Sequence, residues 1–187
     1  LYLSVARNIA RGEGYTHLGE AHRLAYPGIP YLVAGMMKLF GEHAIAVSLA
    51  LIMAMALAAL AVCYRLFRII VSPGVAVIAT LAVSVNYKLY ALSFSILTDV
   101  PFLLGSLLVL LGAAWSGLAP APRVADDAAE ITRRQKRLGW VLMSIGLPLC
   151  AVMRPTFYAL AGGLLLAAVI QIIRTRTLKR GIEVGAV

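Results

Sequence analysis

Three ionisable side chains lie at the edges of long apolar segments, where a charge is costly unless it is paired, solvated or used. They are Lys88, Asp99 and Arg154. Arg154 stands between two short apolar stretches, directly before Pro155, and no acidic residue is close to it in the sequence. A guanidinium presents its N–H donors in a planar fork that matches a phosphate or a carboxylate. We therefore interpret Arg154 as a candidate phosphate-binding residue.

Lys88 and Asp99 each have a structural alternative to a binding role. The run Thr98-Asp99-Val100-Pro101 is typical of a helix N-cap followed by proline in the first turn. Lys88 lies between Tyr87 and Tyr90, a pattern that is typical of a lysine whose ammonium reaches the membrane interface within an aromatic belt. For both residues the structural and the binding interpretations stay open.

The polar part of the N-terminal segment does not form a recognisable metal site. Its acidic and histidine side chains are Glu13, His17, Glu20 and His22. Their spacing matches no known ligand motif and favours a solvated loop. In a later loop, Asp127 and Glu130 fit a capping box better than a metal pair. The sequence assigns no cofactor and no metal ligand, and it leaves dependence on a divalent metal open.

Composition places the chain in a membrane. It is 61% hydrophobic and 13% charged, whereas a soluble domain is about half apolar and about one quarter charged. A net charge of +9 would favour nucleic-acid binding in a soluble protein. Here the basic residues are sorted by membrane side, without interleaved aromatic residues, so no nucleic acid is expected as a partner. Cys63 and Cys150 lie inside apolar runs, as small buried side chains do.

The elements that must position these residues are apolar segments of about the length that crosses a bilayer as a helix. The sequence predicts an all-α, polytopic transmembrane bundle with about five spans: 44–64, 69–86, 100–118, 138–153 and 156–173. Before them, 1–10 has helical apolar spacing and ends near Gly12 and Gly14, and 29–40 is short enough for an interfacial or re-entrant helix. The predicted regions are an outer (periplasmic) loop at 1–41, the first three spans at 42–118, a cytoplasmic loop at 119–137, the last two spans at 138–173 and a basic cytoplasmic tail at 174–187.

The orientation follows from the basic residues. If the spans alternate, one side receives eleven of the 17 Lys and Arg residues and the other receives six. The side with eleven is cytoplasmic by the positive-inside rule. Residues 1–41, the junction that holds Lys88 and Asp99, and the Arg154-Pro155 turn then all face outside. Three polar sites on one face are the observation from which we infer function.

Five stretches resemble, in their order and spacing, the polytopic glycosyltransferases that use polyprenyl-phosphate sugars. These form the GT-C class, and the resemblance is to its dolichyl-phosphate-mannose protein mannosyltransferase-like and aminoarabinose transferase-like bacterial members. The stretches are LYLSVARNIARGEGY (1–15), YPGIPYLVAG (26–35), FGEHAIAVSLA (40–50), YALSFSILTDVPF (90–102) and MRPTF (153–157). Together they span nearly the whole chain.

The resemblance implies a transferase with its site in the outer first loop. In such enzymes an acid of that loop acts as general base on the acceptor. Its position would precede Leu1, so we expect the chain to be a fragment that is inactive alone, with Asp99 as a weak substitute for the catalytic acid. The family turn often reads Tyr-Pro-Pro-Gly, whereas Tyr26-Pro27-Gly28 is one proline shorter.

Physical reasoning and the resemblance agree on a lipid-borne phosphate at the outer bilayer edge. Cations that stabilise the departing phosphate would come from Arg154 and Lys88, together with Arg7 or Arg23. Tyr26 would hydrogen-bond the phosphate or the sugar, and Asp99 completes the set of candidates. Expected partners are a polyprenyl-phosphate-linked sugar, membrane lipids and a cell-envelope acceptor. The expected location is the bacterial inner (cytoplasmic) membrane.

Two other functions remain. A transporter or flippase subunit would show broken helices in symmetric halves and charges near the middle of the membrane. A purely structural membrane subunit would not depend on Arg154.

Overall fold

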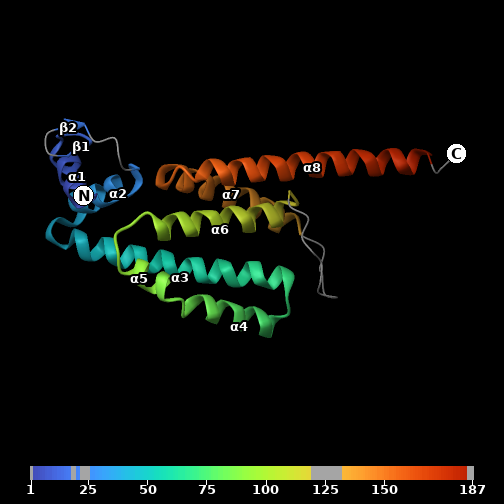
Figure 1. Ribbon diagram of the computed structural model, residues 1–187, viewed down its shortest axis with the longest axis horizontal. Coiled ribbons are helices and arrows are strands. Elements are labelled where there is room, and N and C mark those ends of the chain that lie inside the picture. The colour runs from blue at the N-terminus through green and yellow to red at the C-terminus, as the bar shows by residue number, and fades with distance from the viewer. Residues whose placement is uncertain (1, 18–19, 22–25, 119–131, 185–187) are drawn as a thin grey trace.

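The computed structural model describes residues 2–17, 20–21, 26–118 and 132–184 (Figure 1). The elements are α1 (Tyr2–Arg11), β1 (Thr16–His17), β2 (Glu20–Ala21), α2 (Gly28–Phe40), the 3₁₀ turn η1 (Gly41–His43), α3 (Ala44–Ile70), α4 (Pro73–Ser84), α5 (Tyr87–Ser93), α6 (Asp99–Ser116), α7 (Arg133–Met153) and α8 (Phe157–Val184). The predicted all-α bundle is confirmed. The β structure of the described residues is one antiparallel pair of two-residue strands.

The surface of the bundle is apolar, as a helix that faces lipid requires. Large side chains point outward on successive helices, for example Leu57 of α3 (69% exposed), Ile78 of α4 (68%) and Leu165 of α8 (69%). Among the described residues, three ranges are long and apolar enough to cross a membrane: Gly28–Ile70, Asp99–Ser116 and Arg133–Met153. The pair α4 and α5, bent by 63°, would be a fourth. The fifth predicted span corresponds to the shorter apolar part of α8, Phe157–Ile173.

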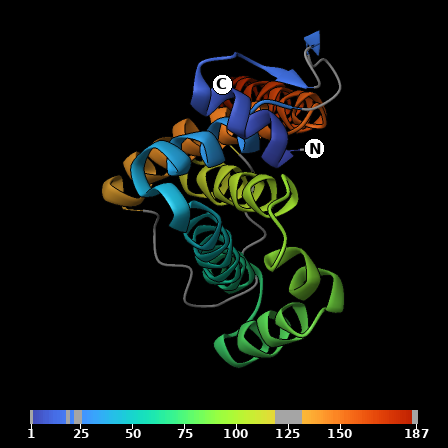
Figure 2. The same ribbon diagram turned by 90° about the vertical axis from the view of Figure 1, so that its left-hand side faces the viewer.

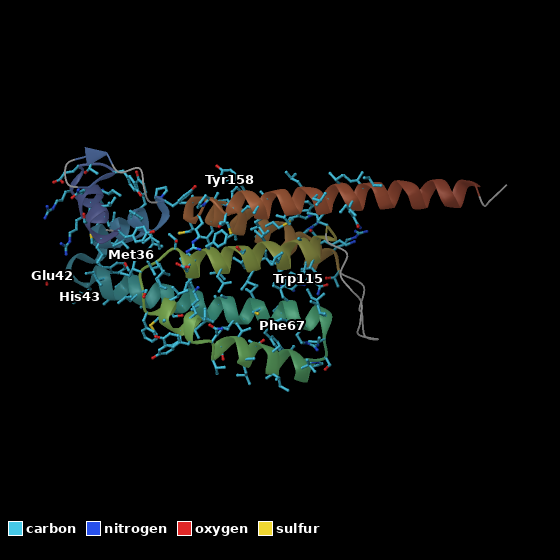
Figure 3. The ribbon with its side chains drawn as sticks, viewed as in Figure 1. Met36, Glu42, His43, Phe67, Trp115 and Tyr158 are labelled. Atoms are coloured by element: carbon cyan, nitrogen blue, oxygen red, sulfur yellow. The ribbon has the colours of Figure 1, made fainter. Side chains whose placement is uncertain are left out.

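The long helices lie side by side in the order α4, α3, α6, α7 and α8 (Figures 1 and 2). Helices α1 and α2 and both strands gather at the end where α3, α6 and α8 begin, which we call the α1–α2 end. Glu42 and His43 lie at this end, whereas Phe67 and Trp115 lie at the opposite end (Figure 3). The alternation that the sequence predicted is therefore present in the bundle.

Some element boundaries differ from the predicted ones. Helix α3 continues to Ile70, so Arg65 and Arg68 form part of its last turns instead of following it. Helix α7 begins earlier than predicted, at Arg133. A capping box starts it, because the Thr132 hydroxyl accepts from the Gln135 backbone N–H and the Gln135 side chain accepts from the Thr132 N–H. The capping box predicted at Asp127 and Glu130 lies outside the described residues.

Helices α6 and α7 are in closer contact than any other pair, because glycines face glycines. A Cβ added to Gly112 would lie 2.5 Å from the carbonyl oxygen of Gly139, and one added to Gly146 would lie 2.6 Å from that of Gly105. The two glycines of each helix are seven residues apart, so they share one face. Small residues allow such close approach of backbones in a membrane.

The N-terminal segment is packed onto the bundle by a core at the α1–α2 end. Gly12, with φ +84°, ends α1 as predicted, and Gly41, with φ +53°, separates α2 from α3. One buried cluster joins five helices; its members are Ala6 of α1, Ile29, Val33 and Ala34 of α2, Ile52 and Ala56 of α3, Val100 of α6 and Met153 of α7. Two of these members, Val100 and Met153, are the chain neighbours of Asp99 and Arg154.

Candidate phosphate-binding site at the α1–α2 end

An ion pair joins the two ionisable residues that flank this core. The Arg154 Nη2 group donates to Asp99 Oδ1 at 2.6 Å, and Arg154 Nε donates to Thr98 Oγ1 at 3.2 Å. The guanidinium carbon lies 6.0 Å from the centre of the Phe102 ring, at the outer limit of a cation–π contact. Arg154 is thus held by Thr98, which precedes α6, and by two residues from the first turns of α6.

Arg154 occupies this place because α7 must end there. The ring of Pro155 disfavours the helical conformation for the residue before it. Arg154 accordingly has φ −153° and ψ 149°, although its N–H still bonds to the Cys150 carbonyl at 3.1 Å. A tight turn follows, in which the Tyr158 N–H donates to the Pro155 carbonyl at 3.1 Å. The side chain therefore leaves the end of α7 beside the start of α6.

The N-cap interpretation of Thr98 and Asp99 is wrong in its hydrogen bonding. Thr98 precedes α6, and Pro101 lies in the first turn as predicted, but no side-chain cap bond forms. The Thr98 hydroxyl instead accepts from Arg154, and Thr98 is only 6% exposed. Asp99 is the first residue of α6, where a negative charge is favoured by the helix dipole. Both side chains are committed to Arg154.

The ion pair lies next to the Tyr26-Pro27-Gly28 turn. A Cβ added to Gly28 would lie 2.7 Å from the Met153 sulfur and 3.0 Å from the Val152 carbonyl oxygen. Any larger residue would require the end of the Met153 side chain or the α7 backbone to shift, so glycine favours the close approach of α2 to the last turn of α7. The missing second proline of the family turn therefore does not separate this turn from Arg154, and Tyr26, half-buried, stands two residues before the contact.

The other predicted site residues are less closely connected. Lys88 lies exposed in the first turn of α5, where its N–H donates to Asn86 Oδ1 at 3.0 Å. Arg7 lies on the exposed face of α1. No contact described for either residue reaches the ion pair. Arg23 and His22 lie outside the described residues. Within the described part of the chain, no three His, Cys, Asp or Glu side chains are close enough to hold a metal ion.

The sequence did not reveal the partner of Arg154, because Asp99 precedes it by 55 residues. A signal was nevertheless present. Two opposite charges stand at the same end of two consecutive spans, and each charge is costly at that depth unless it is paired. Consecutive antiparallel helices are usually neighbours, so pairing the two charges was the simplest resolution.

A second arrangement that the sequence did not reveal orders the segment after α1. The Asn8 side-chain amide donates to the Thr16 carbonyl at 3.0 Å and to the Thr16 hydroxyl at 3.2 Å. This folds the chain back, so that Tyr15 stacks on Tyr31 of α2 with ring centres 6.1 Å apart and planes 15° apart. Burial raises the pKa of Tyr15, and the neighbouring phenols of Tyr2 and Tyr31 raise it further. The Tyr15 phenol is therefore neutral at physiological pH.

The geometry suits recognition of an anion at a membrane surface. The described contacts of Arg154 use its Nε–H and one Nη2–H, and its Nη1 group has no hydrogen-bond partner among the described residues. The side chain is 38% exposed. A guanidinium that is fixed on one edge and open on the other can hold a phosphate oxygen without losing further side-chain freedom.

Comparison with known proteins gives a family match over part of the chain. Residues 25–116 match the family model described as dolichyl-phosphate-mannose-protein mannosyltransferase. The match covers α2 to α6 and contains Tyr26, Lys88 and Asp99, whereas Arg7 and Arg154 lie outside it. No curated protein and no solved structure matched the chain. Residues 25–116 are thus similar to the dolichyl-phosphate-mannose-protein mannosyltransferase family, whose members are membrane glycosyltransferases of the GT-C type.

Proposed function

We propose that the chain is part of a glycosyltransferase that moves a sugar from a polyprenyl-phosphate carrier to a cell-envelope acceptor. The reaction takes place at the periplasmic face of the bacterial inner membrane. In this proposal the α1–α2 end and residues 1–41 face the periplasm, and residues 119–137 and 174–187 face the cytoplasm. The observation that carries the proposal is the Arg154–Asp99 pair beside the Tyr26-Pro27-Gly28 turn.

The chemistry requires stabilisation of a leaving phosphate. An acceptor oxygen attacks the anomeric carbon, the bond between that carbon and the phosphate oxygen breaks, and the acceptor proton passes to a general base. The carrier phosphate departs with one more negative charge than it had in the donor. Arg154 would meet this charge as it develops, because Asp99 and Thr98 already hold its guanidinium in place.

The donor class can be tested with the intact protein in proteoliposomes. We expect transfer of radiolabelled mannose from a short-chain prenyl-phosphate donor to extracted envelope glycolipid, and no transfer from the corresponding nucleotide sugar. Mannose is the first sugar to test because the family description names it. Transfer from the nucleotide sugar alone would contradict the proposal. Movement of the lipid-linked sugar across the bilayer without transfer would favour the transporter alternative.

A smaller effect is expected when Arg154 loses one of its two anchors. Thr98→Val keeps the shape of the side chain and removes the acceptor of the Arg154 Nε–H bond. One hydrogen bond contributes about 1 kcal/mol, so kcat/KM should fall about five-fold. Thr98→Ser retains the hydroxyl and should remain within about two-fold of the unmodified protein. Equal activity of all three proteins would show that the Thr98 contact does not position Arg154.

A further inference from the structure

The stacked tyrosines on the N-terminal segment have features that a solvated loop does not need. Tyr31 is 55% exposed although its ring is packed on one side against Tyr15, which is half-buried. The two ring planes differ by only 15°, and Tyr31 is more than half exposed, so the pair presents a nearly parallel aromatic surface that a ligand can reach. A flat, partly exposed aromatic ring with a neighbouring hydroxyl is a common component of small-molecule sites.

This surface is rigidly supported. Tyr31 lies in the first turn of α2 and donates its N–H to the Pro27 carbonyl at 3.0 Å. Tyr15 is held by the segment that Asn8 fixes through its two bonds to Thr16, and the Glu13 N–H donates to the Asn8 carbonyl at 2.9 Å. Because both rings are fixed before a ligand arrives, little conformational freedom is lost on binding.

The surface also belongs to the same rigid frame as the ion pair. Gly28, which contacts the last turn of α7 beside Arg154, is one turn before Tyr31 on α2. In a prenyl-phosphate sugar, the sugar ring is bonded directly to the phosphate, so a site for the sugar must lie close to the site for the phosphate. The C–H face of a pyranose ring is apolar and flat enough to lie on an aromatic ring, while its hydroxyls can bond to phenols.

We propose that Tyr31, backed by Tyr15, is a stacking platform for a sugar ring. The inference rests on the proposed function in one respect: the stacked sugar would belong to the donor or to the acceptor of the transfer reaction. The platform supplies an apolar face to the ring and hydroxyl partners to its edge, which is the chemistry of a monosaccharide and not of a lipid tail or a metal ion.

Binding can be measured without transfer, by saturation-transfer difference NMR on the intact protein in detergent micelles. The probes are the methyl glycosides of mannose, glucose, galactose and N-acetylglucosamine. We expect Tyr31→Ala to weaken binding of the preferred glycoside by about ten-fold, and Tyr31→Phe, which restores the ring, to stay within about three-fold. Folding is not at risk, because the Tyr31 side chain is more than half exposed.

Tyr90 provides a matched control, since it is also exposed (62%) and pairs with an aromatic ring, Phe94, but in a tilted arrangement. Tyr90→Ala should bind the glycoside as the unmodified protein does. Unchanged binding by Tyr31→Ala, or an equal loss in Tyr90→Ala, would overturn the platform. In transfer assays, a raised KM for the donor alone or for the acceptor alone identifies which sugar is stacked.

The two proposals fail in different ways. Transfer that continues with unchanged KM and unchanged glycoside binding in Tyr31→Ala removes the platform and leaves the proposed function standing. Glycoside binding that depends on Tyr31, in a protein that never transfers sugar from a prenyl-phosphate donor, removes the proposed function and retains the platform.

Discussion

Arg154→Ala is expected to lower kcat/KM for sugar transfer by on the order of 10²–10³-fold, while the protein still inserts into the membrane. The size follows from the loss of a fixed donor at the point where charge develops on the carrier phosphate. Arg154→Lys keeps the charge but replaces the planar fork, whose separate nitrogens contact Asp99 and Thr98, with a single ammonium nitrogen that must serve both residues and the phosphate. We expect an intermediate loss for this variant, measured with the short-chain prenyl-phosphate donor.

A loss of activity alone would not separate contact with phosphate from damage to the ion pair. Alanine at position 154 leaves Asp99, which is 27% exposed, without its cation. The double variant Asp99→Asn with Arg154→Ala removes both charges. If Arg154 serves only to neutralise Asp99, the double variant should regain transfer. If Arg154 contacts phosphate, the double variant should be as inactive as Arg154→Ala. Normal transfer by Arg154→Ala itself would end the phosphate-binding proposal.

The helices could be predicted from the sequence because membranes make the local signal strong. A long apolar run is placed in the bilayer, where lipid offers no hydrogen-bond partner to the backbone N–H and C=O groups. Each run therefore forms a helix, which satisfies these groups internally. The end of α1 at Gly12 and the end of α7 at Arg154 followed from residue-level rules for glycine and proline. The boundary between α3 and α4 differs from the prediction, because Ile69 and Ile70 are apolar and belong to the second predicted span, although they are the last residues of α3.

The partners of the site residues could not be predicted in the same way. The cost of its charge marks Arg154 as a candidate, whereas for Asp99 the sequence leaves a cap and a binding role open, because a Thr-Asp pair near a proline looks the same whether its oxygens face the helix or another chain segment. Whether these oxygens accept from the start of α6 or from Arg154 depends on the distance between α7 and α6. That distance is set by glycines in the middle of the two helices, far from the charges themselves.

The stacked tyrosines were hidden for a related reason. Tyr15 follows two glycines in a polar stretch, and nothing in the local pattern indicates that Asn8 folds this stretch back over α2. Long-range contacts between side chains of an irregular segment carry no periodic signal. The site therefore emerges only when three separate segments, α1 with its loop, α2 and the α6–α7 pair, are brought together.

Because the contact between α6 and α7 sets the geometry of the ion pair, Gly112→Ala is expected to destabilise the protein. A Cβ at this position would lie 2.5 Å from the Gly139 carbonyl oxygen and 2.7 Å from Met143 Cγ. The carbonyl belongs to the helix backbone and cannot move aside alone, so the helices must separate. Overpacking of this kind costs about 1–3 kcal/mol, which corresponds to a fall in Tm of about 2–12 °C in detergent.

Gly163→Ala in α8 is the matched control, because nothing lies within 4 Å of an added Cβ there. Alanine is favoured over glycine within a helix by about 1 kcal/mol, so Tm should stay the same or rise. The same Gly→Ala substitution should thus lower Tm in α6 and leave it unchanged or raise it in α8. A general intolerance of glycine replacement would lower Tm in both helices. Transfer activity should fall with Gly112→Ala even below its Tm, since separated helices would carry Asp99 away from Arg154. Equal Tm values for the two variants would show that the glycine contacts do not hold α6 against α7.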